Sequence, residues 1–437
     1  MIRSIDELSS MFDSYAPSFS DRNLREKRLE RMIRLLDRLS HPELDYRTYH
    51  TAGSKGKGTT SAFLAAILEG SGRRCGLYTS PHLYSIKERF MLPFSFFPEE
   101  LYIDTANLLL SKISSFTLPS FLGVPSPTTF ELYTAYSYLL FKEYGCTDAV
   151  IETGLGGRLD ATNTLSPEAV LLTPIELEHT EVLGKTIAAV ACEKSKVMRK
   201  GVPAFISKQP VDAERVFNAE GSILPCPVTF LSDAMTGFSS RTLRDGERME
   251  AVIDGMKYSL DLSMTTRAMA ENASLAILAS SRIGFLTEKG LENLEKVSLP
   301  GRFEKLDVDG HFTVVDSAHT VHSAKSTADA FSDITSDPET AVLIFSAVEG
   351  KDIEGMMRVL FPAFRRIIIS KPGSFKKSNP EGIYNLAKSI YPEKNITLES
   401  DPDKALENAL REGDDILITG SFYLPAEMKK IRSAHES

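Results

Sequence analysis

The sequence predicts a two-domain α/β protein, in which a mostly parallel sheet flanked by helices is followed by a smaller, doubly wound α/β domain. Its 437 residues exceed the size at which one hydrophobic core usually keeps growing. Short apolar segments bounded by turn signals alternate with segments of helical spacing, which is typical of buried parallel strands and their crossover helices. This rhythm restarts after the Pro-Gly step within 298–302, so we expect domains at 1–299 and 300–437.

The first domain is expected to begin with one amphipathic helix at 23–39, where apolar residues recur at helical spacing with Arg and Glu between them. A short segment at 46–52 runs into a glycine-rich turn, and a helix follows at 59–68. Residues 209–262 have mixed polarity and weak periodicity, so no elements are predicted there. Further buried strands are predicted at 75–79, 149–153, 169–173 and 204–207.

The second domain repeats this alternation and is expected to be Rossmann-like. Its predicted strands lie at 312–315, 341–345, 366–369 and 415–419. Its predicted helices lie near 322–331, 352–360, 380–389 and 402–411.

Composition argues against several classes of protein. Hydrophobic residues make up 42% of the chain and charged residues 25%, which is ordinary for a globular protein and argues against disorder. The formal net charge of −9 argues against a nucleic-acid partner, so an anionic substrate needs a local basic site. No leader-like segment opens the chain and no apolar run approaches bilayer length, so we expect a cytoplasmic protein without a membrane partner. The four cysteines form no CxxC pair and no metal-ligand spacing.

A glycine-rich loop between a predicted strand and a predicted helix indicates a P-loop-type phosphate site. Residues 53–60 read Gly-Ser-Lys-Gly-Lys-Gly-Thr-Thr. Glycines let the backbone wrap around phosphate oxygens, the helix N-terminus directs N–H groups at them, and a lysine neutralises their charge. The alternative is a glycine turn that only caps a helix, but the flanking elements favour the phosphate site. We expect nucleotide contacts from Gly53, Gly56, Lys57, Gly58 and Thr59.

The spacing within this loop differs from that of GTPases and kinases. Two residues, Ser54 and Lys55, separate its first two glycines where those loops have four, and Gly58 follows the lysine. This form is typical of ATP-dependent amide ligases.

Further motifs follow the loop in order along most of the chain. They lie at 78–83 (Tyr-Thr-Ser-Pro-His-Leu), 87–90 (Lys-Glu-Arg-Phe), 129–131 (Thr-Phe-Glu), 151–163 (Ile-Glu-Thr-Gly-Leu-Gly-Gly-Arg-Leu-Asp-Ala-Thr-Asn), 178–184 (Glu-His-Thr-Glu-Val-Leu-Gly), 193–194 (Glu-Lys), 300–304 (Pro-Gly-Arg-Phe-Glu), 316–319 (Asp-Ser-Ala-His) and 418–424 (Ile-Thr-Gly-Ser-Phe-Tyr-Leu). With these motifs the sequence resembles the folylpolyglutamate synthase and dihydrofolate synthase family, a branch of the Mur-type ligases. Because the motifs occur in order at compatible spacing, chance is a poor explanation of the resemblance.

The resemblance implies an ATP-dependent acid–amino-acid ligase. In such an enzyme a substrate carboxylate attacks the γ-phosphate of ATP, and the amino group of L-glutamate captures the resulting acyl phosphate. The expected substrates are ATP, L-glutamate and either dihydropteroate or a reduced folate. The sequence does not separate dihydrofolate synthase from folylpolyglutamate synthase, because both use the same phosphate and metal chemistry. A bifunctional enzyme is our preferred interpretation.

The resemblance also implies two magnesium ions. Ser80, Glu152 and His179 match the Mg²⁺ ligands of the family, and Lys194 matches a lysine that is carbamylated to hold a second Mg²⁺. Glu152 ends an apolar strand, where a carboxylate is costly unless it is paired or metal-bound, so its own setting also favours a ligand. Taken alone, Ser80 fits a turn cap, His179 a structural histidine and Lys194 a solvated helix lysine. The expected catalytic residues are Lys57, Glu152, His179 and Lys194.

Other positions match the nucleotide and pterin contacts of the family. Arg302, Asp316 and His319 of the second domain match ATP contacts, as does Asn272 near the end of the first domain, which implies an ATP site between the domains. The matching residues of the acceptor site are Leu29, Glu30, Arg31, Phe130, Glu131, Leu159, Asp160 and Ala161.

Several positions depart from the family pattern. They are Lys55 for Asn, Glu178 for Asp, Met269 for Gln, Ser317 for Gly, and Thr320 and Val321 for Asn-Pro. Because they lie near the ATP-side hinge and the metal-proximal loop, turnover or the exact acceptor could differ from the family norm. Two alternatives stay open: a Mur-like ligase that acts on a non-pterin carboxylate, and a non-catalytic ATP- or folate-binding homologue. The sequence does not reveal the oligomeric state, although the resemblance favours a monomer.

Overall fold

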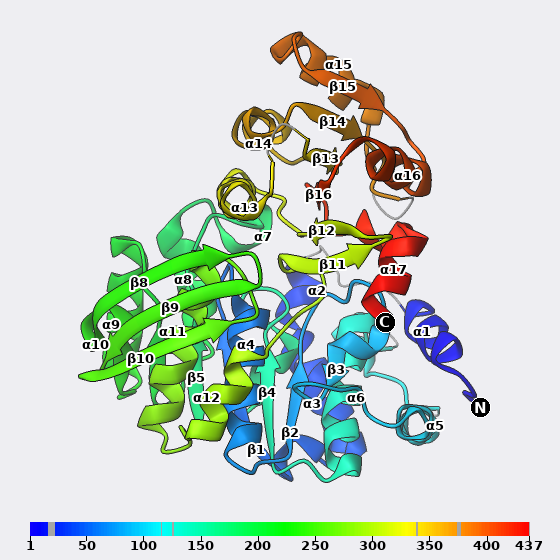
Figure 1. Ribbon diagram of the computed structural model, residues 1–437. Helices are drawn as coiled ribbons and strands as arrows, with labels where there is room; N and C mark the ends of the chain where they lie inside the picture. Colours follow the sequence, from blue (N-terminus) through cyan, green and yellow to red (C-terminus); the bar gives the residue numbers. More distant parts are fainter. Residues whose placement is uncertain (16–21, 115, 125, 338–339, 374–376, 437) are drawn as a thin grey trace. The chain divides into compact units, whose positions relative to one another are not determined.

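The computed structural model describes residues 1–15, 22–114, 116–124, 126–337, 340–373 and 377–436 (Figure 1). The chain divides into two compact units. The first consists of Met1–Ser239, Glu250–Leu260 and Glu271–Val297, and the second of Ser240–Met249, Asp261–Ala270 and Ser298–Ser437. Each unit has its own α/β sheet and core, so the predicted two-domain α/β fold is confirmed. The assignment of domains at 1–299 and 300–437 stays a prediction.

A seven-stranded sheet forms the centre of the first unit. Its strands are β1 (Arg47–Ala52), β2 (Cys75–Tyr78), β3 (Phe90–Met91), β4 (Asp148–Glu152), β5 (Ala169–Leu172), β6 (Ala204–Ile206) and β7 (Val228–Phe230). The order is β3-β2-β4-β1-β5-β6-β7, and all neighbouring pairs are parallel except β2 with β3. Every residue of β2, β4 and β5 is buried, which explains why these strands are nearly continuous apolar runs in the sequence.

Helices cover both faces of this sheet (Figure 1). The α-helices of this unit are α1 (Ile5–Asp13), α2 (Arg22–Glu26), α3 (Arg28–Leu39), α4 (Lys57–Gly70), α5 (Glu99–Ile113), α6 (Thr129–Tyr144), α7 (Thr180–Leu183), α8 (Ile187–Ser195), α9 (Val211–Ile223), α10 (Leu231–Ala234) and α12 (Glu288–Glu295), while α11 (Arg267–Arg282) begins in the second unit and ends in the first. α4 packs against β2, β4 and α12, and α3 packs against α5 and α6. In the described part of the chain, no helix is both long enough and apolar enough to cross a bilayer.

Two expectations about the first 262 residues need correction. The single helix predicted at 23–39 is wrong, because Lys27 leaves the helical conformation (φ −89°, ψ 1°) and separates α2 from α3. The Lys27 ammonium donates to the carbonyl of Phe121, a distant contact that leaves the local apolar spacing unchanged. The unassigned segment 209–262 contains α9, β7, α10 and a three-stranded sheet of β8 (Met235–Leu243), β9 (Gly246–Ile253) and β10 (Met256–Leu262).

The second unit contains a six-stranded sheet in the order β11-β12-β16-β13-β14-β15. The strands are β11 (Glu304–Val308), β12 (His311–Val315), β13 (Val342–Phe345), β14 (Arg366–Ile369), β15 (Asn395–Leu398) and β16 (Asp415–Thr419). Only β11 is antiparallel to its neighbour. The helices are α13 (Val321–Ile334), α14 (Ile353–Leu360), α15 (Pro380–Ile390), α16 (Pro402–Glu412) and α17 (Lys429–Glu436). All predicted strands and helices of the smaller domain are therefore confirmed in type and approximate position.

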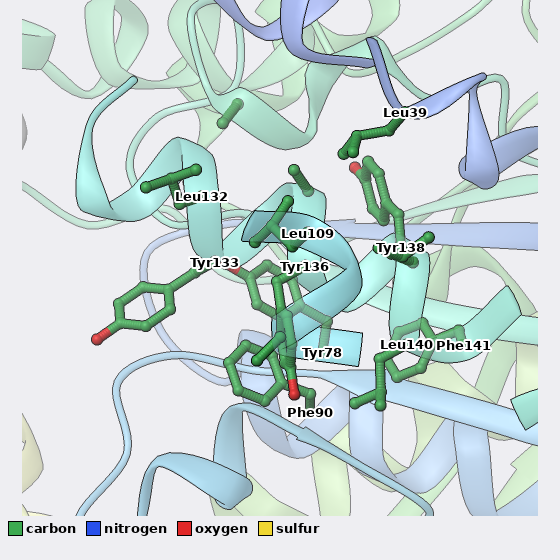
Figure 2. Packing of buried hydrophobic residues seen from close by; sticks show 14 of the residues in the cluster. Leu39, Tyr78, Phe90, Leu109, Leu132, Tyr133, Tyr136, Tyr138, Leu140 and Phe141 are labelled. Atoms are coloured by element: carbon green, nitrogen blue, oxygen red, sulfur yellow. The ribbon is translucent and has the colours of Figure 1, made fainter. Parts of the chain in front are cut away.

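An aromatic cluster joins α6 to β2 and β3 in the core of the first unit. Figure 2 shows Tyr133 and Tyr136 of α6 near Phe90 and Tyr78. The Phe90 ring stacks on Tyr78 with centroids 6.2 Å apart and meets the edge of Tyr136 at 4.9 Å. Because Tyr78 is the last residue of β2, this packing fixes the start of the loop that carries Ser80.

Replacing Phe90 with alanine should lower the free energy of unfolding by about 3–5 kcal/mol, because a fully buried ring is removed from between neighbouring rings. Urea unfolding followed by far-UV circular dichroism measures the loss as a lower midpoint of the transition. Phe94→Ala is the matched control, since the Phe94 ring is 42% exposed, and it should change the free energy by less than about 0.5 kcal/mol. Equal effects of the two substitutions would contradict the prediction.

Candidate active site

The glycine-rich loop joins the carboxyl end of β1 to α4 and is shaped by close neighbours. Gly53 (φ 147°) and Gly56 (φ 80°) adopt conformations that side-chain-bearing residues rarely take. A Cβ at Gly53 would collide with the hydroxyl of Thr173, and one at Gly56 would lie 2.6 Å from Asn272 Oδ1. α4 begins at Lys57, so the N–H groups of its first turn and the positive end of its dipole face the loop. The geometry suits a bound phosphate.

Three loops leave the sheet at this edge because β1 lies between β4 and β5. Thr51 pairs with Glu152 of β4, and Ala52 pairs with Leu172 of β5. The chain passes to one side of β1 through β2 and β4 and then to the other side through β5, so β1 marks the switch point where open α/β sheets bind ligands. The amide of Ser54 donates to the carbonyl of Pro174, which ties the loop after β1 to the segment after β5.

Glu152 brings a buried carboxylate to the phosphate loop. Its Oε2 accepts a hydrogen bond of 2.9 Å from the Ser80 amide, and its Oε1 lies 4.0 Å from Lys57 Nζ. A Cβ at Gly58 would lie 3.2 Å from Oε2, so the glycine makes room for this carboxylate. Carboxylate and hydroxyl oxygens from Glu152 and Ser80 are ligands that Mg²⁺ prefers. The chemistry of these side chains is compatible with Mg²⁺, and the metal site stays a prediction.

His179 is less tightly placed than the other predicted ligands. It caps the start of α7 with a left-handed backbone (φ 46°), and its side chain is 55% exposed. Its Nδ1 lies 3.7 Å from Glu181 Oε1. Among the described residues, no cluster of three or more His, Cys, Asp or Glu side chains is arranged to hold a metal. The role of His179 as a ligand therefore stays a prediction.

Lys194 is buried beneath the phosphate loop rather than solvated. Its Nζ donates to the carbonyl of Gly53 (2.6 Å) and to Glu178 Oε1 (2.9 Å). Burial, together with the nearby charge of Lys57, lowers the pKa of Lys194 to about 8. The unmodified ammonium thus pairs with Glu178, so a carbamylated, metal-binding Lys194 would need this pair to open, and its carbamylation stays a prediction. The neighbouring Lys196 pairs with Glu220 at 2.6 Å.

Two predicted acceptor-site residues form an ion pair with each other in the protein interior. Arg31 of α3 donates from Nη2 to Glu131 Oε1 at 2.7 Å, and both side chains are fully buried. Glu131 also accepts from the amide of Thr128, completing the capping box that starts α6. By contrast, Glu30 is paired with Arg34 on the exposed face of α3. Arg31 and Glu131 therefore join two helices.

The other predicted acceptor-site residues lie along α3, α6 and the loop after β4. Phe130 is partly exposed, and a Cβ at Gly154 would collide with its ring. Leu159 and Ala161 are buried in that loop, and the carbonyl of Leu159 accepts from Arg28 at 3.4 Å. Leu29 is partly exposed next to Arg28 on α3. Asp160 is fully buried and bonded within its own loop. The structure thus brings these residues to one region of the first unit.

The predicted nucleotide residues of the second unit form their own local network. Asp316 accepts from the Phe303 amide (2.9 Å) and from the hydroxyl of Thr327 (2.7 Å). Burial raises the pKa of Asp316, although these hydrogen bonds oppose the shift. Arg302 lies over the ring of Phe422, and Nδ1 of His319 donates to the carbonyl of Ser317. Binding of the nucleotide between the two units stays a prediction.

Residues 87–90 form a motif whose role the sequence alone does not reveal. In the structure, the Glu88 carboxylate accepts from the amides of Leu83, Tyr84 and Ser85. Arg89 donates from Nε to His82 Nδ1 at 2.7 Å. Burial, with the nearby Arg89, lowers the pKa of His82 to about 3, so the ring is neutral. Both motif residues hold the loop that carries Ser80, and the presence of charged residues in a short fixed motif was the only signal available.

Comparison with known proteins gives consistent matches. The family described as "Mur ligase, glutamate ligase domain" matches residues 301–422. The dihydrofolate synthase/folylpolyglutamate synthase of Bacillus subtilis is 30% identical over 92% of this chain and 94% of its own length. The folylpolyglutamate synthase structure from Thermotoga maritima has a TM-score of 0.83 at 26% identity, covering 96% of this chain and 94% of that chain. A folylpolyglutamate synthase from Mycobacterium tuberculosis, solved with ADP and AMPPCP, has the same fold, with a TM-score of 0.85 at 24% identity and 97% coverage of both chains.

Gly56→Ala should weaken binding of ADP by about tenfold or more, because the new Cβ meets Asn272 and the backbone must keep φ near 80°. Isothermal titration calorimetry measures the dissociation constant directly. Gly72→Ala, at the other end of α4, is the control, since it has φ 84° but no atoms within 4 Å of the new Cβ. It should lose about 1 kcal/mol of stability and keep the affinity for ADP. If Gly56→Ala bound ADP as tightly as the wild-type protein, the assignment of the phosphate site would be wrong.

Arg31→Met should destabilise the first unit by about 3–5 kcal/mol, because it leaves the Glu131 carboxylate buried without its cation. Adding Glu131→Leu should restore part of the loss, since an apolar pair of similar volume replaces the ion pair. Chemical denaturation measures both effects. Glu30→Gln, which breaks the exposed pair on the same helix, should change the stability by less than about 0.5 kcal/mol. A single variant Arg31→Met as stable as Glu30→Gln would refute this assignment.

Proposed function

Because the chain belongs to the folylpolyglutamate synthase and dihydrofolate synthase family, we propose that it is an ATP-dependent ligase that joins L-glutamate to a folate-type carboxylate. The observation that carries the proposal is the meeting of Lys57, Glu152 and the Ser80 amide at the switch point of the first sheet. A phosphate site and a buried carboxylate on one sheet edge are what transfer of a phosphoryl group to an acceptor requires.

The reaction has two steps. In the first, an acceptor carboxylate oxygen attacks the γ-phosphorus of ATP, the bond to the bridging oxygen breaks, and ADP leaves. In the second, the amine of glutamate attacks the carbonyl carbon of the acyl phosphate, the amide C–N bond forms, and phosphate leaves while the amine loses a proton. Both steps bring anions together, so the protein must supply positive charge and exclude water.

Residues of this chain supply that charge at fixed positions. Lys57 and the first turn of α4 neutralise the terminal phosphates, as the loop geometry allows. Ser80 and Glu152 would hold Mg²⁺, which when bound neutralises charge on the phosphoryl group. We further propose His179 as a ligand of this site. A second Mg²⁺ on a carbamylated Lys194 would require its pair with Glu178 to open, and a mass increase lost on acidification would reveal the carbamate.

The acceptor would lie against Phe130 and the loop that holds Leu159 and Ala161, with Arg302 and His319 of the second unit contributing to ATP binding. We propose that the acceptor is dihydropteroate, reduced folate or both, with a bifunctional enzyme preferred. We also propose that the protein is a cytoplasmic monomer. These assignments rest on the family membership and on the position of the residues in its motifs.

The wild-type protein should release ADP in a glutamate-dependent reaction with a pterin acceptor, and Lys57→Ala should lower kcat about a hundredfold or more, because the charge on the terminal phosphates is no longer balanced. A coupled ADP assay measures the rate. Lys185→Ala is the control, since Lys185 is an exposed lysine in the same unit, and it should keep full activity.

The ratio of kcat/KM for dihydropteroate to that for reduced folate monoglutamate decides between the two synthase activities, because it reports discrimination between their transition states. Glutamate-dependent ADP release with other carboxylates alone would instead favour a Mur-like ligase of different acceptor class. Absence of turnover with every pterin acceptor, together with tight binding of pteroate, would favour a non-catalytic homologue.

A further inference from the structure

A chain of hydrogen bonds connects the strand that leads into the phosphate loop with the loop that follows β4. His50 lies on β1 shortly before Gly53, and its side chain is fully buried. Its Nε2 lies 2.8 Å from Thr162 Oγ1, and the same hydroxyl lies 2.6 Å from Asp160 Oδ1. The chain therefore runs from the central strand to the short 3-10 helix η4 (Ala161–Thr164).

The donors and acceptors in this chain follow from the number of protons. The hydroxyl of Thr162 has one proton, which it donates to Asp160, because a carboxylate only accepts. Thr162 Oγ1 must therefore accept from His50, so Nε2 of His50 carries the proton. Nδ1 of His50 is buried and has no hydrogen-bond partner among the described residues, as expected for the bare nitrogen of a neutral ring. Burial, with the nearby Arg199, lowers the pKa of His50 to about 3, so the ring stays neutral at physiological pH.

Asp160 uses its other bonds to close the loop after β4. Its Oδ2 accepts from the Leu155 amide at 2.8 Å, and its Oδ1 accepts from the Thr162 amide at 3.1 Å. Because Asp160 is fully buried, its carboxylate organises the backbone from Leu155 to Thr162 rather than facing solvent. That backbone carries Leu159 and Ala161, two residues of the proposed acceptor site.

We propose that His50 is a positioning residue that holds the 155–162 loop in register with the phosphate loop through Thr162 and Asp160. β1 carries His50 and leads directly into the phosphate loop. The hydrogen-bond chain therefore connects the 155–162 loop, which carries part of the proposed acceptor site, to the strand that positions the phosphate loop. Small displacements between reacting groups cost large factors in rate. The effect on catalysis rests on the proposed function, whereas the effect on the loop does not.

Hydrogen exchange measured by mass spectrometry tests the effect on the loop in the full-length protein without ligands. His50→Leu removes the donor, so the amides of Leu155 and Thr162 should exchange about tenfold faster, as expected when a buried hydrogen bond is lost. The amides of α4 should keep their wild-type protection. Thr162→Val should reproduce the result, and it provides a second variant if His50→Leu folds poorly.

Two further variants separate positioning from general damage to the core. His50→Gln places an amide N–H near the position of Nε2 and should restore most of the protection. Thr51→Val removes a neighbouring buried hydroxyl that has no hydrogen-bond partner in the described residues, and it should leave the loop unchanged. Unchanged exchange in both His50→Leu and Thr162→Val, or equally fast exchange in His50→Gln, would overturn the proposal.

Steady-state kinetics then tests the consequence for catalysis. His50→Leu should raise the KM for the acceptor about tenfold while the KM for ATP stays within about twofold, and His50→Gln should recover most of the acceptor affinity. The double variant with Thr162→Val should be no worse than either single variant, because both break one chain. Equal increases in the two KM values would argue for unspecific damage and against positioning. A wild-type protein with a protected loop but no turnover would refute the proposed function while leaving the loop measurement valid.

Discussion

The central position of β1 is the constraint on which the candidate site depends. With β4 and β5 parallel on either side, the loops that follow these strands must share one edge of the sheet. Side chains are excluded at Gly53 and Gly56, because Thr173 after β5 and Asn272 of α11 occupy the space. Gly53 and Gly56 are therefore required by the protein's own packing, independently of any ligand. The same shared edge brings the carboxylate of Glu152 to the start of α4.

Electrostatics at this edge differ from those of the chain as a whole. The protein carries a formal net charge of −9, yet Lys55, Lys57 and Lys194 surround Glu178 near the phosphate loop. Burial raises the pKa of Glu178, but attraction to these lysines, Lys194 foremost, lowers it below its usual value. Three lysines thus lie close to Glu178 beside the phosphate loop of an acidic protein, and positive charge concentrated there would favour an anionic ligand.

Local patterns in the sequence were sufficient to predict those strands and helices whose residues are uniformly buried. β4 is buried at every residue, so its apolar run and its final carboxylate stand out. β8 has no fully buried residue, so no alternation revealed it. Lys27 at the helix break donates to Phe121, and His50 is hydrogen-bonded to a residue 112 positions later, so neither contact leaves a trace in nearby residues. The phosphate loop was predicted because its glycines, lysine and flanking elements are all contiguous.

The buried ion pair between α3 and α6 also limits how this protein can diverge. Loss of either Arg31 or Glu131 alone leaves an unpaired charge buried in the core. The two positions are therefore expected to change together or to remain fixed during evolution. Glu30 and its partner Arg34 are exposed to solvent, so neither position is restricted in this way. Changes can therefore accumulate on the exposed face of α3, while the interface between the two helices is inherited intact.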